Sequence, residues 1–158
     1  MIYAVFNHTK QMRLILRIGQ LALKVPVIGL FLSVWCEYII RIVYSSDISC
    51  RAKISPDVVF VHGHDIVIGS DVVIGRGCKI FNGVTLGNKD TEVALNAQPI
   101  IGDDCVISTG AKILGGVTIG DRSIVGANAV VLRDVPSDMV AVGVPARVFP
   151  KKKIAGAI

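Results

Sequence analysis

Residues 100–131 read IIGDDCVISTGAKILGGVTIGDRSIVGANAVV, and this stretch decides the fold. A large aliphatic residue recurs in it at every sixth position, from Ile101 to Val131. A six-residue period matches neither the helical period of about 3.6 residues nor the alternation of a simple strand. It predicts a short strand and a corner, repeated, with three such units closing one triangular coil of about eighteen residues.

The six-residue period continues toward the N-terminus, so we expect a stack of about four coils. The aliphatic side chain of each unit points inward and stacks on its equivalents in the coils above and below. Two positions earlier comes a small or β-branched residue, which fills the space near the corner. The predicted inward residues are Ile48, Ile54, Phe60, Ile68, Ile74, Ile80, Leu86, Ile101, Ile107, Ile113, Ile119, Val125 and Val131.

Glycine follows the inward residue in six units, for example at Gly102 and Gly120. Because glycine has no Cβ, it adopts a positive φ without strain, and we expect these glycines to turn the corners in that conformation. Cys78 and Cys105 fall in the layer of small residues. A free cysteine packs there as a small apolar side chain, so we predict packing roles for both thiols.

Two interruptions break the period. Phe60 and Ile68 are eight residues apart, which is an insertion of two within 61–67, and a fifteen-residue gap follows Leu86. Repeat proteins accept insertions as loops, and such loops often lie on the binding face. The sequence thus predicts a short kink at 61–67 and a longer exposed loop near 88–98.

The first 45 residues lack the six-residue period and have a helical pattern instead. Basic residues at helical spacing form one stripe, and aliphatic residues fill the opposite side. We expect Pro26 and Gly29 to end this helix, and a second helix to run from about residue 30 to residue 44. The basic stripe consists of Lys10, Arg13, Arg17 and Lys24.

The two predicted helices have two alternative uses. They pack on the solenoid or on a neighbouring subunit, or they associate peripherally with a membrane. A basic stripe opposite an apolar stripe is typical of helices that lie in a membrane interface. A spanning helix is not expected, because it needs about 20 mostly uncharged residues.

The chain has 158 residues, of which 52% are hydrophobic. We expect a helical segment at 1–45, a β-helix domain at 46–135, and a C-terminal cap with a basic tail at 136–158. The net charge of +5 gathers at the ends, since residues 1–45 carry five basic residues against Glu37 and residues 146–158 carry four against none. A basic face interleaved with aromatic residues is missing from the middle, so no nucleic-acid partner is expected.

The four cysteines show no CxxC spacing, and we expect neither zinc nor another metal. The start of the chain lacks the pattern of a cleavable signal peptide. We therefore expect free thiols and a cytoplasmic location, peripheral to the inner membrane in the case that residues 1–45 bind lipid.

The kink at 61–67 carries the side chains best suited to chemistry. Activating a hydroxyl requires a base that titrates near neutral pH, as imidazole does, and His62 is our candidate. A carboxylate on the far ring nitrogen would fix the tautomer and stabilise the imidazolium. Asp47 precedes His62 by fifteen residues, which places it in a neighbouring coil. His64 and Asp65 either bind the acceptor or shape the kink.

Three segments resemble the serine acetyltransferase branch of the hexapeptide-repeat acyltransferases. They are IVIGSDVVIGRGCKIFNGVTLGN, IIGDDCVISTGAKILGGVTIGDRSIVGANAVVLRDVP and VAVGVPARV, and with the Asp47–His62 spacing the likeness covers residues 46–149. The resemblance implies an all-β fold, a homotrimer of left-handed parallel β-helices, with acetyl-CoA and acceptor meeting between subunits. It also implies that Asp47 and His62 form the general base, and that the hydroxyl attacks the thioester directly.

The same resemblance implies contacts with acetyl-CoA. Main-chain groups near the pantetheine or thioester also suit the developing oxyanion. Basic residues toward the C-terminus are candidates for the phosphates, with a solvated tail as the alternative for the lysines. The implied contacts are Gly87, Asn88, Thr109, Ala127, Arg133, Arg147 and Lys151, with Lys152 and Lys153 beside it.

The sequence departs from the family in two places. The family has Arg-His-Pro in the exposed loop, where the Arg and His help to hold an amino-acid carboxylate. The matching stretch here is Asn96, Ala97, Gln98 and Pro99, which supplies no positive charge. The helical N-terminal domain is also shorter than in the family. Both departures resemble the short acetyltransferases of exopolysaccharide, capsule and colanic acid synthesis, which act on sugars.

We therefore predict an acetyl-CoA-dependent O-acetyltransferase that acts on a saccharide or lipid-linked glycan acceptor. One alternative is the same reaction on L-serine, in cysteine biosynthesis. Another, from a different class, is a non-catalytic solenoid that serves as a scaffold at the membrane.

Overall fold

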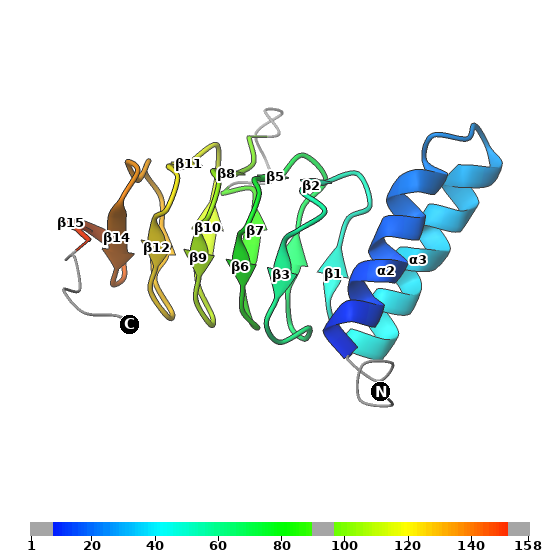
Figure 1. The fold of residues 1–158 in the computed structure, drawn as a ribbon, viewed down its shortest axis with the longest axis horizontal. Helices are drawn as coiled ribbons and strands as arrows, with labels where there is room; N and C mark the ends of the chain where they lie inside the picture. The colour runs from blue at the N-terminus through cyan, green and yellow to red at the C-terminus, as the bar shows by residue number, and fades with distance from the viewer. Residues whose placement is uncertain (1–7, 90–96, 152–158) are drawn as a thin grey trace.

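The computed structural model describes residues 8–89 and 97–151. It shows a left-handed parallel β-helix with a helical hairpin at one end and an antiparallel pair of strands at the other (Figure 1). This confirms the predicted fold class. The elements are α2 (His8–Ala22), α3 (Ile28–Tyr44), β1 (Asp47–Ile48), β2 (Lys53–Ile54), β3 (Val59–Phe60), β4 (Val67–Ile68), β5 (Val73–Ile74), β6 (Lys79–Ile80), β7 (Thr85–Gly87), β8 (Ile100–Ile101), β9 (Val106–Ile107), β10 (Lys112–Leu114), β11 (Thr118–Ile119), β12 (Ile124–Val125), β13 (Val130–Val131), β14 (Met139–Val142) and β15 (Arg147–Pro150).

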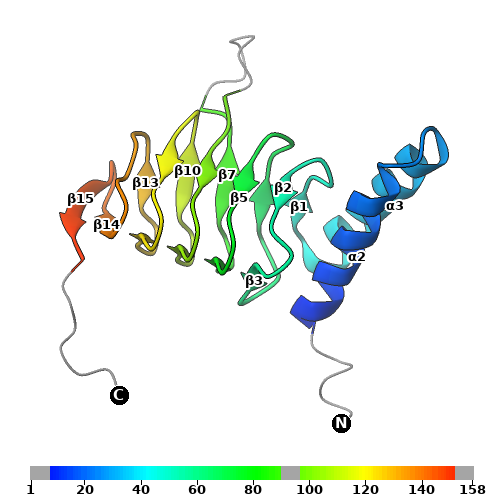
Figure 2. The same cartoon turned by 45° about the horizontal axis from the view of Figure 1, so that its top comes forward.

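The strands form three sheets, which are the three sides of the solenoid (Figure 2). Their orders are β1-β4-β7-β10-β13, β2-β5-β8-β11 and β3-β6-β9-β12-β14-β15. The pairing register gives the number of residues in each coil. Lys112 pairs with Val130 eighteen residues on, Asp47 pairs with Val67 twenty residues on, and the coil that contains the long loop takes twenty-seven. The predicted insertions at 61–67 and 88–98 are therefore confirmed as additions to an eighteen-residue coil.

The interior of the solenoid is the predicted aliphatic stack. Every predicted inward residue is buried, and the most exposed of them, Ile54, is only 6% accessible. Each two-residue strand turns its first side chain outward and its second inward, because successive side chains of a strand point to opposite faces. Cys78 and Cys105 are fully buried in the layer of small residues, as predicted.

The corner glycines have a different role from the one we predicted. Glycines that follow an inward residue do not have positive φ; the positive-φ positions come just before the small residue instead. A Cβ on Gly102 would lie 2.9 Å from the backbone nitrogen of Asp121, and one on Gly120 would lie 2.8 Å from the carbonyl carbon of Pro136. These glycines are thus required by the close approach of the next coil. The left-handed positions include Gly77, Gly83, Asp104, Gly110, Arg122 and Asn128.

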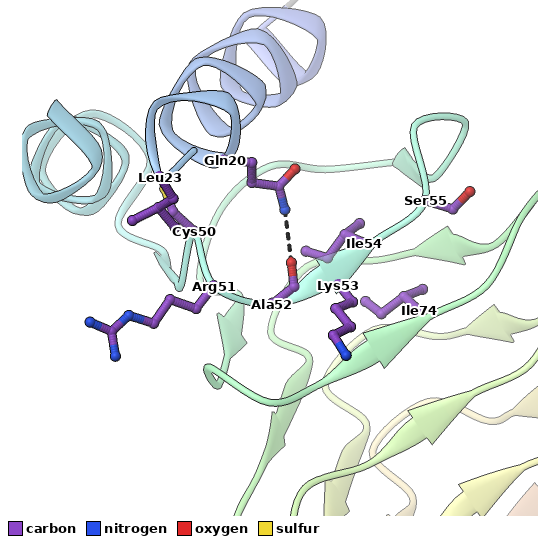
Figure 3. Close-up of a pocket in the computed structure, with 9 residues that line it drawn as sticks. All are labelled: Gln20, Leu23, Cys50, Arg51, Ala52, Lys53, Ile54, Ser55 and Ile74. Atoms are coloured by element: carbon purple, nitrogen blue, oxygen red, sulfur yellow. Dashed lines mark hydrogen bonds between the residues drawn. The ribbon is translucent and has the colours of Figure 1, made fainter. Parts of the chain in front are cut away.

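The helical hairpin, α2 with α3, packs against the first coil. The first coil has no preceding coil to bond with its outer backbone groups, and polar side chains of the hairpin bond to these groups instead. Gln20 Nε2 donates to the Ala52 carbonyl at 2.9 Å, beside an open cavity of about 530 Å³ that holds none of the predicted site residues (Figure 3). Arg17 donates to the Ile54 carbonyl at 2.9 Å. Part of the predicted basic stripe therefore faces the coils.

The hairpin differs from prediction at one point. Gly29 does not end a helix but lies buried inside α3, where a Cβ would overlap the Ala22 backbone of α2. Glycine is therefore needed for the close crossing of the two helices. Within the described residues, neither helix has the length and apolarity needed to cross a membrane.

The described C-terminal segment forms two strands of four residues each. Strand β14 continues the sheet in parallel with β12, whereas β15 turns back and pairs antiparallel with β14. The regular stacking of coils therefore stops at β15.

Candidate active site

Most of the predicted site residues lie on or beside one sheet. We call β1-β4-β7-β10-β13 the site sheet. Its outward row runs from Asp47 through Val67, Thr85 and Lys112 to Val130, which pair in register. With strands about 4.8 Å apart, this row is about 19 Å long. Asp47 lies in its first strand and His62 in the turn that leads into its second strand, and the predicted phosphate ligands follow its last strand in the chain.

His62 lies at the corner through which the chain enters the site sheet. Its exposed ring meets Phe81 edge-on, with ring centroids 6.3 Å apart, and the ring of His64 is 6.4 Å away. An imidazole held at one edge by an aromatic ring and open to solvent elsewhere is accessible to an acceptor hydroxyl. This is the position that a general base requires.

Asp47 lies in the strand beside the kink, as its spacing predicted. Its backbone N–H donates to the Ile66 carbonyl at 2.7 Å. Its carboxylate, however, accepts from Arg41 of α3 at 2.8 Å, and in the described part of the chain no hydrogen bond joins it to His62. The bond to Asp47 raises the pKa of the Arg41 guanidinium. Sequence reasoning missed this partner, although Arg41 was visible as one of two charged residues in an apolar helix.

His64 and Asp65 shape the kink through their backbones. The His64 carbonyl accepts from Gly83 in the next coil at 3.3 Å, and the Asp65 N–H donates to Ser45 at 3.1 Å. Asp65 has a φ of 57°, which aspartate tolerates better than most residues. Both side chains are exposed at the mouth of the corner, so their proposed contact with the acceptor stays a prediction.

Thr109 and Ala127 occupy the same corner in later coils. The Thr109 hydroxyl donates to Asn82 Oδ1 at 3.2 Å, and the Thr109 carbonyl accepts from the N–H of Asn128 at 2.9 Å. Ala127 directly precedes Asn128. These residues therefore form a column that leads along the edge of the site sheet, away from His62.

Gly87 lies at the opposite edge of the site sheet, at the end of β7. Its carbonyl accepts from the N–H of Gly115 at 2.8 Å, and a Cβ added to Gly87 would meet nothing within 4 Å. Asn88 follows it at the start of the long loop. The surface at Gly87 is therefore open, which fits the predicted close approach of a ligand to the main chain.

A cavity of about 610 Å³ lies beside the site sheet, at the residues that follow its last strand. Arg133 and Arg147 both line it, as does Lys89, which sequence reasoning missed although it adjoins Asn88. Asp134 also lines the cavity, and its Oδ1 accepts from the N–H of Thr118 at 2.8 Å. Three cationic side chains around one cavity suit the binding of phosphate groups.

Lys151 does not line this cavity. Its Nζ donates to the Arg122 carbonyl at 3.0 Å, at the outer end of the solenoid. The structure thus separates Lys151 from Arg133 and Arg147, with which we grouped it. Lys152 and Lys153 lie outside the described residues.

The coils and this site define a β-helix protein of the hexapeptide transferase class, and comparison with known proteins agrees. Residues 98–133 match the family model "Bacterial transferase hexapeptide (six repeats)", and residues 65–89 match "Hexapeptide repeat of succinyl-transferase". The chain carries the hexapeptide repeats of the acyltransferase superfamily, and it is similar to the serine acetyltransferase branch of that superfamily.

The relatives that support this branch are serine acetyltransferases. The enzyme of Synechococcus elongatus is 37% identical over 126 residues, which are 80% of this chain and 50% of that protein. The enzyme of Mycobacterium tuberculosis is 42% identical over 69% of this chain and 47% of its own length. The chain thus spans about half the length of these curated relatives.

Solved structures agree with this assignment. Soybean serine acetyltransferase, as an apoenzyme, superimposes with a TM-score of 0.85 and 34% identity, over 93% of this chain and 60% of that one. A serine acetyltransferase in complex with CoA gives a TM-score of 0.76 and 34% identity, over 85% of this chain and 54% of that one.

These relatives contradict our prediction of a saccharide acceptor. That prediction depended on the uncharged stretch at 96–99, and the structure shows why the stretch is a weak guide. The Gln98 Oε1 accepts from the N–H of Asp71 at 3.1 Å, and Ala97 lies beside Gly116, where an added Cβ would be 3.1 Å from the Ala97 Cβ. Both side chains fit the corners of the coils, so their lack of charge says little about the acceptor. Asn96 lies outside the described residues.

Proposed function

We propose that this chain transfers an acetyl group from acetyl-CoA to the hydroxyl of L-serine, giving O-acetylserine and free CoA. The observation that carries the proposal is the likeness to serine acetyltransferases over the coils that hold the site sheet, with 34% identity to structures solved with CoA and with serine. The corner at His62 and the cationic cavity lie at the two ends of this sheet.

The reaction needs one base and no covalent intermediate. His62 takes the proton of the serine hydroxyl as the oxygen attacks the thioester carbon. Main-chain N–H groups at the corner hold the oxyanion that forms. The carbon–sulfur bond then breaks, the carbonyl re-forms, and the proton passes to the CoA sulfur. Arg41 holds one oxygen of Asp47. In the working complex the other oxygen of Asp47 accepts from the imidazole of His62 and orients it.

The site sheet determines how acetyl-CoA is oriented along the solenoid. The cofactor is elongated, with a thioester at one end and phosphates at the other. Arg133, Arg147 and Lys89 hold the phosphates in the cavity at the C-terminal end. The pantetheine arm then lies along the open edge at Gly87. That edge is opposite to the His62 corner, so the thioester meets His62 between subunits.

We further propose that the working unit is a homotrimer in the cytoplasm, with the acceptor bound between subunits. Val67, an outward residue of the site sheet that is 41% exposed, is one apolar side chain available for such a contact. Light scattering on the purified chain tests the trimer, and a monomer that retains full turnover would contradict it.

The test of the activity is release of free thiol from acetyl-CoA by the purified chain. We expect saturable release with L-serine and none above background with L-alanine, which has the same carboxylate and amine but no hydroxyl. Mass spectrometry then identifies O-acetylserine. Serine-independent release, or binding of acetyl-CoA without any turnover on serine, would contradict the proposal.

A further inference from the structure

The hairpin exposes far more apolar surface than the rest of the molecule. Fifteen of the twenty-three exposed large hydrophobic residues in the described chain lie between Leu14 and Val43. Phe31 is 67% exposed, Trp35 61% and Ile42 60%. Isolated exposed apolar residues are ordinary, but a contiguous patch of this extent on a helix pair indicates a binding surface.

The charged side chains of α3 contact the coils instead. Glu37 and Arg41 are the only charged residues of α3. Glu37 accepts from the N–H of Cys50 at 2.6 Å, and Arg41 pairs with Asp47 at 2.8 Å. The side of α3 that faces away from the coils therefore presents no charge, although it is exposed.

The exposed charges of the hairpin favour one partner over another. Arg17, Glu37 and Arg41 contact the coils, whereas Lys10 and Lys24 are exposed, and no acidic side chain of residues 8–44 is exposed. A second copy of the hairpin would bring only further positive charge to the contact, which disfavours association. An anionic lipid surface complements this charge and accepts an apolar face without requiring a matching shape.

We propose that the outward face of the α2–α3 hairpin docks the protein on an anionic lipid bilayer. The apolar side chains of α3 enter the interface, with Phe31 and Ile42 among the deepest. Trp35 and Tyr38, whose rings meet edge-on at 5.8 Å, lie at the level of the headgroups, where such residues are enriched. The hairpin lies at one end of the solenoid (Figure 1), so the coils project away from the bilayer and the site sheet stays in water.

Flotation of the full chain with vesicles tests this docking. Phosphatidylcholine vesicles with and without phosphatidylglycerol are compared at low salt. We expect binding to the anionic vesicles that weakens as salt is added, together with a shift of tryptophan emission to shorter wavelength. Trp35 is the only tryptophan of the chain, so this emission reports on the hairpin alone.

Two substitutions separate the apolar contribution to vesicle binding from the electrostatic one. Phe31→Gln should lower the partition coefficient about tenfold, and Lys24→Gln about fivefold. Their matched controls are Phe149→Gln, at an exposed position of β15, and Lys53→Gln, at an exposed position of β2, which should leave binding unchanged. All four side chains are at the surface, so circular dichroism should show intact folds.

Three results would overturn the docking. One is the absence of binding to either vesicle, and another is an equal loss of binding in the control variants. The third combines two observations: the Trp35 emission of the wild-type chain is already at shorter wavelength without lipid, and the Phe31→Gln variant has a lower solution mass than the wild type. Together they would assign the face to a second copy of the chain. None of these readouts depends on turnover, so the docking and the transferase activity fail or succeed separately.

Discussion

In the coils, each strand turns one side chain into the core and one toward solvent, whereas α3 turns large apolar side chains both toward the coils and away from them. Ile107 is fully buried in the solenoid, while Ile42 of the hairpin is 60% exposed. The two regions use the same aliphatic residues. The coils use them to close their own interior, and the hairpin has more of them than its own packing requires.

This difference teaches how an apolar pattern should be interpreted. Where the pattern matches the burial that the fold provides, as in the coils, it explains stability. Where it exceeds that burial, it points to a partner outside the chain. The predictions below test this division, beginning with the largest effect.

The largest expected effect separates the chemistry from the hairpin. His62→Ala should lower kcat on L-serine about 10²–10⁴-fold, because it removes the proposed base. Phe31→Gln, on the outward face of α3, should leave turnover on this soluble acceptor unchanged. Thiol release measures both, and acetyl-CoA binding by the His62 variant serves as the control for folding. Full turnover in His62→Ala would remove His62 from the mechanism.

The second prediction compares the same substitution in the two regions. Ile107→Ala should lower the free energy of unfolding by about 2–5 kcal/mol, because it leaves a cavity in the packed interior. Ile42→Ala should change it by less than about 0.5 kcal/mol, since that side chain is mostly exposed. Urea denaturation followed by circular dichroism measures the two values. Equal losses would show that the outward face of α3 is already covered in solution.

The third prediction concerns the cavity at the far end of the site sheet. Arg147→Ala should raise the KM for acetyl-CoA about tenfold with little change in kcat, because a charged hydrogen bond to phosphate is lost. Arg51→Ala, an exposed arginine of the first coil beside the hairpin, is the matched control. An unchanged KM in the Arg147 variant would place the phosphates elsewhere.

The smallest expected effect is on acid stability within the coils. A backbone N–H and the guanidinium of Arg76 hold the pKa of Asp103 below its usual range. A lowered pKa in the folded state stabilises the protein above the unfolded pKa of about 4, and this contribution is lost as pH falls through the folded value. Asp103→Asn should therefore lower Tm at neutral pH, and the difference from wild type should shrink toward about pH 2.

The neighbouring Asp104→Asn is the control for this experiment. Asp104 has a left-handed backbone, which asparagine also tolerates, so the conformation of the corner is retained. A Tm difference for Asp103→Asn that persists in acid would mean that packing, and not charge, makes the contribution.

Much of the coil region was predictable because a closed repeat leaves few alternatives. Period alone identified the inward residues and the two insertions. It gave the wrong reason for the corner glycines, because the sequence of a single repeat does not show how closely the next coil approaches it. At Gly102, a neighbour nineteen positions along the chain determines the requirement.

The candidate site was predictable only in part. The fifteen-residue spacing placed Asp47 and His62 in neighbouring coils, but the pairing of Asp47 with Arg41 depends on how α3 meets the first coil, which no local pattern records. The acceptor was predicted wrongly, because the stretch at 96–99 was interpreted as a lost carboxylate clamp. Lys89 was missed because its only signal is its place next to Asn88.

The way in which the solenoid ends has a consequence for its behaviour in concentrated solution. A parallel stack with bare end strands is a template onto which further chains can add, as in cross-β fibres. Here Gln20, Arg17 and Glu37 occupy the backbone groups of the first coil, and β15 reverses the strand direction at the last. The hairpin at one end and β15 at the other therefore prevent further coils from adding to the stack. We expect a chain without its hairpin to polymerise end to end even if each of its coils stays folded.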